Sequence, residues 1–337
     1  MNILLTLEQG ETRTIYFPEA AMDAIRSLGN LRLNDSEKPF TEQELAERMG
    51  DADVCLTHWG CPRFTKDVLD RAPKLRLIAH AAGSVAGHIT DEVYNRGIRV
   101  CSSNEIMAKY VAEGILAYML SALRMVPRHD RDMKAGVLWN RRVTEVKSLY
   151  GARVGFIGLG TVGRYLLKLL QPFDTAVRLY DPYCSAEEIK NHAQLELRSL
   201  EEVLSWADVI SVHASLTAET YHMLNAGRLG LIRDGALLIN CARGAVFNED
   251  DLVSELETER FSAVLDVFEE EPLPLDHRLR HMKNVTLNPH MAGKPAREQM
   301  TFAMADEIGR WINGQPLIFE IPYQKYKLMT NEKPVQA

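Results

Sequence analysis

The sequence predicts an α/β protein of two parallel-sheet domains, Rossmann-like or flavodoxin-like, with a cleft between them. Three observations support this fold class. Short apolar runs alternate with helical runs along both halves of the chain, as in a parallel sheet. A glycine-rich turn at Gly158-Leu159-Gly160-Thr161-Val162-Gly163 joins an apolar run to a helical one. The length of 337 residues suits two domains of ordinary size.

The first part of the chain, residues 1–103, is predicted to form one small α/β domain. Thr41-Glu42-Gln43-Glu44 matches a capping box that opens a helix. We expect residues 314–337 to complete this domain, with a polar end that frays. Strands are expected at 2–7, 53–57, 75–80 and 98–101, and helices at 19–28, 42–49, 65–69 and 89–95.

A long apolar helix is predicted over residues 105–125, ended by Pro127. It is apolar on nearly every face, so we expect both sides to be covered at a seam between domains. Its Lys109, Glu113 and Arg124 would be poorly tolerated in a membrane span. Residues 128–150 are charged and predicted to be irregular, with Trp139 as an apolar anchor.

Residues 104–313 are predicted to form a second domain that includes both long helices. The second of these helices is expected at 298–312, closed by Gly314. The strand count is that of a doubly wound dinucleotide domain, with runs at 154–157, 176–180, 209–213, 236–241, 262–267 and 285–287.

The glycine turn predicts a dinucleotide site. Glycines at this spacing give a tight turn, close approach to a pyrophosphate and close helix–strand packing. Asp181 ends the next apolar run, 18 residues after Gly163, where a carboxylate can accept hydrogen bonds from a ribose. Pro182, Tyr183 and Cys184 follow, with no Arg or Lys for a 2′-phosphate, so we expect NAD, with NADH preferred over NADPH.

Composition excludes several classes of protein. The chain is 46% hydrophobic and 25% charged, as in soluble globular proteins, and its net charge of −7 argues against a nucleic-acid partner. No signal peptide is predicted at the N-terminus, and no membrane association is expected. Five cysteines without a CxxC pattern indicate reduced thiols in a cytoplasm, and no metal site is predicted.

Arg243, Glu271 and His290 follow predicted strands of the second domain, at the edge where open α/β sheets bind ligands. Arg243 has a planar fork suited to a carboxylate, but is alternatively a surface residue in a turn. Asp266 interrupts an apolar strand, so it is either paired internally or aimed at a ligand. Glu271 alternatively belongs to a solvated acidic loop, and His290 to a structural hydrogen bond.

The order of these motifs resembles that of the D-2-hydroxyacid dehydrogenases, which include glyoxylate/hydroxypyruvate reductases, D-lactate dehydrogenases and phosphoglycerate dehydrogenases. The resemblance covers about residues 50–315. It is carried by the glycine turn, by Asp181 and by these segments: Val111-Ala112-Glu113, His213-Ala214-Ser215-Leu216-Thr217, Glu219-Thr220, Ile239-Asn240-Cys241-Ala242-Arg243-Gly244, Leu265-Asp266-Val267-Phe268, Glu271-Pro272 and Pro289-His290-Met291-Ala292-Gly293.

The resemblance implies a catalytic set of Arg243, Glu271 and His290, acting between NADH and a small 2-oxo acid of the glyoxylate or hydroxypyruvate kind. It also implies domain closure over the bound pair. The implied substrate side is Gly83, Ser84 and Val85 together with Arg243. The implied cofactor set is Gly158, Gly160, Thr161, Val162, Gly163, Asp181, His213, Thr217, Cys241, Ala242, Asp266 and Gly293.

Some features leave the function open. The loop Gly83-Ser84-Val85-Ala86-Gly87 lacks the Asp common in the family, and Ser215 replaces a frequent Pro, so the substrate can be unusual. Trp59 either lines the substrate mouth or packs on a neighbouring loop. An NAD(H)-sensing co-repressor-like binding protein and a dehydrogenase of a substrate such as phosphite are the alternatives. The family's usual state implies a homodimer.

Overall fold

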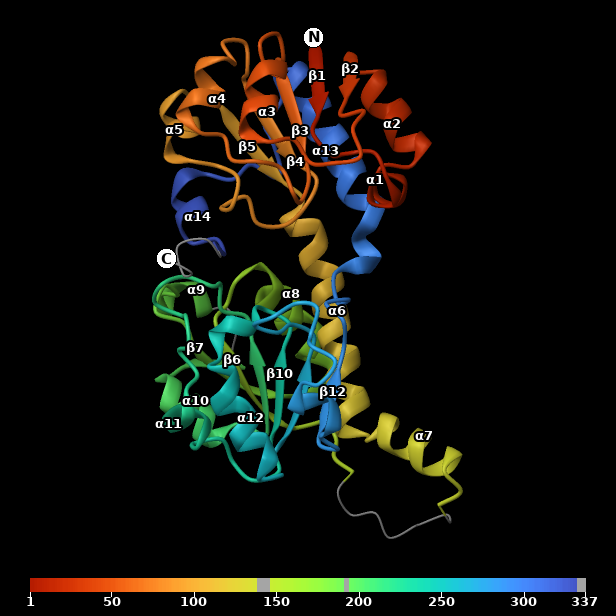
Figure 1. The fold of residues 1–337 in the computed structure, drawn as a ribbon. Helices are drawn as coiled ribbons and strands as arrows, with labels where there is room; N and C mark the ends of the chain where they lie inside the picture. The colour runs from red at the N-terminus through yellow and green to blue at the C-terminus, as the bar shows by residue number, and fades with distance from the viewer. Residues whose placement is uncertain (138–145, 191–193, 332–337) are drawn as a thin grey trace. The chain divides into compact units, whose positions relative to one another are not determined.

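The computed structural model describes residues 1–137, 146–190 and 194–331 and divides the chain into two compact units. The first unit contains Met1–Met107 and Lys294–Ala337, and the second contains Ala108–Gly293 (Figure 1). Each unit is built around its own parallel sheet. The predicted fold class of two parallel-sheet α/β domains is therefore confirmed.

The first unit has a five-stranded sheet of order β2-β1-β3-β4-β5, the flavodoxin-like arrangement. The strands are β1 (Asn2–Leu5), β2 (Asn30–Leu33), β3 (Val54–Thr57), β4 (Leu77–His80) and β5 (Arg99–Ser102). All of β3 and β4 is buried, as expected for central parallel strands. The helices of this unit are α1 (Glu11–Tyr16), α2 (Glu19–Arg26), α3 (Glu42–Arg48), α4 (Lys66–Asp70), α5 (Asp91–Asn95), α13 (Arg297–Ile312) and α14 (Tyr323–Lys327).

The capping box at the start of α3 is confirmed, since Thr41 Oγ1 accepts from the Glu44 N–H at 3.2 Å and the Glu44 carboxylate accepts from the Thr41 N–H at 2.8 Å. Strand β2 was not predicted. Helix α13 was expected in the dinucleotide domain, but it groups with the first unit because it packs against α1, α2 and β4 (Figure 1).

The second unit has a seven-stranded parallel sheet of order β12-β11-β10-β9-β6-β7-β8. The strands are β6 (Arg153–Ile157), β7 (Ala176–Tyr180), β8 (Leu195–Leu197), β9 (Val209–Val212), β10 (Leu237–Asn240), β11 (Ser262–Leu265) and β12 (Val285–Leu287). Six of them were predicted, and β8, an edge strand of three residues, was not. The helices are α8 (Thr161–Leu170), α9 (Ala186–Ile189), α10 (Leu200–Trp206), α11 (Ala226–Leu229) and α12 (Glu249–Glu257).

Two helices depart from the expectations. Helix α6 (Asn104–Leu123) was expected to be covered on both sides, but only six of its residues are buried in this chain. The length and composition of α6 would also allow it to cross a membrane. This is weak evidence for a membrane span, because core helices of soluble proteins have the same length and composition. Residues Val126–Lys134 form helix α7 rather than irregular chain, with Pro127 in the first turn, where proline is tolerated. Trp139, the expected anchor, lies outside the described residues.

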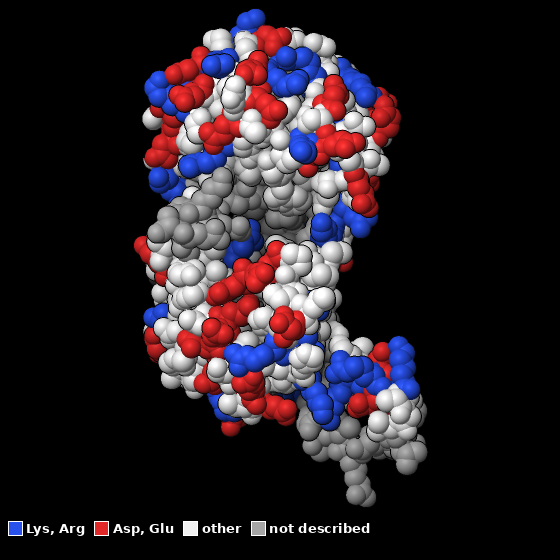
Figure 2. Space-filling view, viewed as in Figure 1, with Lys and Arg blue, Asp and Glu red and all other residues white. Residues whose placement is uncertain are grey.

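Charges of both signs are intermixed on the face shown in Figure 2, in agreement with the moderate net charge of −7. All five cysteines are free thiols, and three of them, Cys55, Cys61 and Cys101, are buried. The two sheets therefore owe their stability to apolar burial rather than to covalent links.

Candidate functional site

The glycine turn follows β6 and opens α8. Gly158 has a φ of +89°, and a Cβ there would lie 3.0 Å from the Ala214 backbone nitrogen. Gly160 is the N-cap of α8, and no side chain caps the helix. A Cβ at Gly160 would meet nothing nearer than the His213 carbonyl oxygen at 3.9 Å. The backbone at Gly160 is thus open to close approach by another group, which fits a pyrophosphate at the start of α8.

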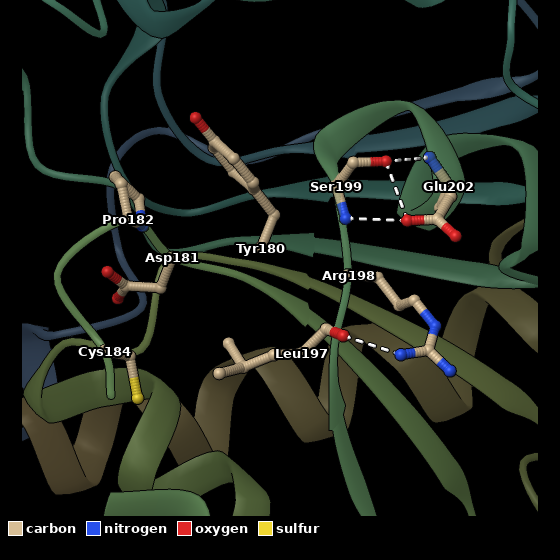
Figure 3. A pocket seen from close by; sticks show the side chains of 8 residues that line it. All are labelled: Tyr180, Asp181, Pro182, Cys184, Leu197, Arg198, Ser199 and Glu202. Atoms are coloured by element: carbon tan, nitrogen blue, oxygen red, sulfur yellow. Dashed lines mark hydrogen bonds between the residues drawn. The ribbon is translucent and has the colours of Figure 1, made fainter. Parts of the chain in front are cut away.

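Asp181 follows β7 and closes the turn. Its carboxylate accepts from the Leu159 N–H at 2.7 Å and from the Tyr183 N–H at 2.8 Å. Asp181 also lines a pocket of about 520 Å³. Figure 3 shows its carboxylate on one side of this pocket and Arg198 on the other. The Arg198 guanidinium is engaged by Glu196 and by the Leu197 carbonyl.

The loop after β9 lies against the glycine turn. The His213 ring packs on Phe156 at 4.9 Å between centroids, and a Cβ at Gly163 would lie 3.4 Å from it. Burial lowers the pKa of His213 to about 3, so this imidazole is neutral. Thr217 is held by Thr220, whose hydroxyl accepts from the Thr217 N–H at 2.9 Å.

The loop after β10 carries Arg243 and is shaped by Asn240. The Asn240 amide oxygen accepts from the Ala242 N–H at 3.0 Å, and its amide nitrogen donates to the Arg243 carbonyl at 3.0 Å. Gly244 comes next, and a Cβ there would lie 1.9 Å from the Phe268 carbonyl carbon. Only glycine lets this loop approach the loop after β11 so closely, and Glu271 lies on that second loop.

Glu271 and His290 form a pair. His290 Nδ1 lies 2.8 Å from Glu271 Oε2, and Glu271 Oε1 accepts from the Phe268 N–H at 3.0 Å. Partial burial acts to raise the pKa of Glu271, but the hydrogen bonds from His290 and Phe268 and the charge of Arg243 outweigh it and lower the pKa. The carboxylate is therefore ionised at neutral pH.

Asp266 accepts hydrogen bonds from the backbone directly after His290. It is 1% exposed, and its two oxygens accept from the Met291 and Ala292 N–H groups at 2.9 and 3.0 Å. His290 itself has a φ of +52°, a conformation that costs a non-glycine residue about 1–3 kcal/mol. The structure shows the internal pairing that was one of the two alternatives for Asp266.

In the first unit, Gly83, Ser84 and Val85 follow β4. Within the described part of the chain, the N–H groups of Ser84 and Val85 donate to no protein acceptor. The Ser84 hydroxyl donates to the Thr330 carbonyl at 2.7 Å and accepts from the Ala86 N–H at 3.3 Å. This turn therefore offers two backbone donors on a fixed frame, as an anion requires.

Trp59 follows β3 and is 41% exposed. Its ring meets Tyr16 edge-on at 5.6 Å and His58 at 4.6 Å. His58 is 1% exposed, and neither of its ring nitrogens has a partner among the described residues. Burial, then the charges of Lys294 and His88, lowers the pKa of His58 to about 3. Trp59 thus packs on neighbouring rings while keeping an exposed edge.

The predicted site residues therefore form two groups. In the second unit, adjacent strands β10, β11 and β12 bring Arg243, Asp266, Glu271 and His290 to one sheet edge, and the glycine turn follows β6 of the same sheet. Met1–Met107 holds the substrate-side group of Gly83, Ser84, Val85 and Trp59. The sequence prediction included Asn240 only as part of a family motif and gave it no role, although an Asn at the end of an apolar run was a visible indication. Arg198 was not predicted at all, because it lies 17 residues from Asp181 in the sequence.

Comparison with known proteins agrees with this geometry. Residues 116–292 match the family model described as the NAD binding domain of D-isomer specific 2-hydroxyacid dehydrogenase. A D-3-phosphoglycerate dehydrogenase of Methanocaldococcus jannaschii is 31% identical over 87% of this chain and 56% of that protein. A glyoxylate reductase of Pyrococcus horikoshii is 31% identical over 88% of this chain and 91% of that protein.

Solved structures match both units. The TT0316 protein of Thermus thermophilus superposes with a TM-score of 0.77 at 29% identity, over 96% of this chain and all of that one. The glycine turn and the match to an NAD binding domain together define a protein that binds a nicotinamide dinucleotide. The chain belongs to the D-isomer specific 2-hydroxyacid dehydrogenase family, whose members act as oxidoreductases on the CH–OH group of their donors.

Proposed function

We propose that the chain is an NADH-dependent reductase of small 2-oxo acids, of which glyoxylate and hydroxypyruvate are the first candidates. The observation that carries the proposal is the Glu271–His290 pair, 2.8 Å between Oε2 and Nδ1, at the same sheet edge as Arg243. An ionised carboxylate on one ring nitrogen leaves the other ring nitrogen for a substrate oxygen. The relatives named glyoxylate reductase support the substrate class.

Arg243, His290 and Glu271 each have a separate role in the proposed reaction. Arg243 binds the substrate carboxylate with its planar fork and polarises the adjacent carbonyl. His290, protonated, donates a proton to the carbonyl oxygen as negative charge develops there. Glu271 orients His290 and favours its imidazolium form, and Asp266 holds the backbone of His290 through Met291 and Ala292. In the oxidative direction, neutral His290 accepts the hydroxyl proton.

The glycine turn, Asp181 and the loop after β9 would hold the dinucleotide. Bound in its reduced form, the cofactor supplies the hydride that reduces the carbonyl carbon. The negative charge of Asp181 would repel a 2′-phosphate, which supports NADH over NADPH. Arg198 lines the same pocket, but Glu196 already engages its guanidinium. The residues assigned here are Gly158, Gly160, Thr161, Val162, Gly163, Asp181, His213, Thr217, Cys241, Ala242, Asp266 and Gly293.

On the substrate side, we assign the N–H groups of Ser84 and Val85 to the carboxylate and the exposed edge of Trp59 to the substrate tail. The two backbone donors and the 41% exposure of Trp59 support this assignment. A cytoplasmic homodimer is the assembly we propose, by analogy with the family, and unpaired cysteines are consistent with that compartment.

The test is NADH oxidation with glyoxylate, hydroxypyruvate, pyruvate and phenylpyruvate, each repeated with NADPH. We expect turnover on glyoxylate or hydroxypyruvate and a higher kcat/KM with NADH than with NADPH. Folded protein that binds NADH but reduces none of the four would contradict the proposal. NADH-dependent capture of a protein partner without turnover would instead support a co-repressor-like role.

A further inference from the structure

The C-terminal segment is anchored along the sheet of the first unit. Residues 319–321 run antiparallel to β5, with the Ile321 N–H donating to the Val100 carbonyl at 2.8 Å and the Ser102 N–H donating to the Phe319 carbonyl at 3.1 Å. Ile321 is 3% exposed and belongs to the apolar core. The segment directly before α14 is therefore fixed to β5, near the carboxyl end of that strand.

Helix α14 then binds the segment that follows the turn after β4. The Tyr326 hydroxyl donates to the Ile89 carbonyl at 3.2 Å, and its ring is 9% exposed. The Tyr323 hydroxyl and the Lys327 ammonium both contact Asp91, at 3.1 and 3.4 Å. Tyr326 lies within the apolar core of this unit, and Met329 packs against that core. These contacts hold residues 326–330 beside residues 84–91.

The last contact reaches the proposed substrate turn itself. Thr330 accepts the Ser84 hydroxyl at 2.7 Å through its carbonyl oxygen. The same hydroxyl accepts from the Ala86 N–H, so one side chain connects the C-terminal segment to both sides of Val85. The carbonyls of Ala82 and Gly83, which directly precede Ser84 in the chain, accept from the buried Ser102 hydroxyl. The polar groups that flank the two N–H donors are thus engaged, and the turn is held on both sides.

We propose that residues 326–330 are a positioning element for the substrate carboxylate site. The Thr330 carbonyl fixes the Ser84 hydroxyl, and this keeps the N–H groups of Ser84 and Val85 directed to one carboxylate of a 2-oxo acid. The inference rests on the proposed function, and it adds a part of the chain remote in sequence from every motif of the site. A segment that only stabilised the first unit would change the melting temperature without a selective effect on KM.

The experiment compares two shortened chains. The test chain ends at Leu328 and loses Thr330, and the matched control ends at Asn331 and loses only residues outside the described part of the chain. For the test chain we expect KM for glyoxylate or hydroxypyruvate to rise about fivefold, the contribution of one ordinary hydrogen bond. Its kcat and its affinity for NADH should change less than twofold, and the control should match the full chain.

Substitutions at Ser84 provide a test without a new chain end. Ser84→Ala should raise KM about fivefold and Ser84→Thr, which keeps a hydroxyl, should restore most of it. Combining Ser84→Ala with the chain ending at Leu328 should be no worse than the larger single effect, because both remove one interaction.

An unchanged KM in the shortened chain and in Ser84→Ala would overturn this inference while the proposed function stands. A rise in KM accompanied by equal losses of kcat and NADH affinity would also overturn it, because that pattern indicates general destabilisation. Absence of turnover in the full chain would overturn the proposed function and this inference with it.

Discussion

Replacing Glu271 by Gln tests how the carboxylate acts on His290. The substitution is nearly isosteric, and the new amide oxygen can still accept from the Phe268 N–H, so the loop should keep its fold. What is lost is the negative charge 2.8 Å from His290 Nδ1. A hydrogen bond between charged groups contributes about 1.5–3 kcal/mol. Since the His290 and Glu271 side chains are 50% and 37% exposed, the lower end applies, about 1.5 kcal/mol.

That energy predicts the size of the effect on catalysis. The value of kcat/KM for 2-oxo acid reduction should fall about tenfold, since about 1.36 kcal/mol corresponds to a factor of ten. The assay is the kcat/KM profile between about pH 5 and pH 10, with Glu270→Gln at the exposed neighbouring position as control. A profile in Glu271→Gln that coincides with that of the parent would refute the reasoning.

Three further predictions concern the cofactor turn, the substrate fork and the acid stability of the first unit. Gly158→Ala places a Cβ 3.0 Å from the Ala214 nitrogen at a φ of +89°, so NADH affinity by fluorescence should fall about tenfold or more, whereas Gly227→Ala, with 3.6 Å of space, should not change it. Arg243→Lys keeps the charge but loses the fork, so KM for the 2-oxo acid should rise about tenfold while NADH binding persists; an unchanged KM would contradict the assignment. Burial holds the pKa of His58 near 3, so the unfolded chain binds a proton below pH 6.5 that the folded chain does not, and stability falls as the pH falls. When the pH is lowered from 7 to 5, the free energy of unfolding of His58→Phe should therefore fall by about 2 kcal/mol less than that of the parent, measured by urea denaturation. Equal falls in the two proteins would show that His58 is protonated in the folded chain.

The elements that sequence reasoning found are those whose physics is local. The glycine turn, the capping box at Thr41 and the buried central strands all carry their pattern within a few residues. Strands β2 and β8 were missed because they lie at sheet edges and a charged residue interrupts the apolar run of each, Arg32 in β2 and Glu196 in β8. Helix α7 was missed because it buries no residue, so its sequence has no apolar stripe.

The site was predictable as a list of residues but not as a set of contacts. Strand order decides that Arg243, Glu271 and His290 meet, and strand order is a property of the whole sheet. The pairing of Asp266 with the backbone after His290 spans 25 and 26 residues, and the bond between Ser84 and Thr330 spans 246. No local pattern encodes contacts at such separations. The burial of His58 by Tyr16 and Trp59, which leaves its nitrogens unpartnered among the described residues, is likewise visible only in the fold.

The most direct test of the central claim is a single measurement on His290→Ala. Turnover of NADH with the best 2-oxo acid should fall by about 10²- to 10⁴-fold, the usual contribution of a general acid. NADH affinity, measured on the same preparation by fluorescence titration, should stay within about threefold of the parent, because no cofactor contact is assigned to this ring. Equal loss of turnover and of NADH binding would show that His290 is structural and would contradict the account.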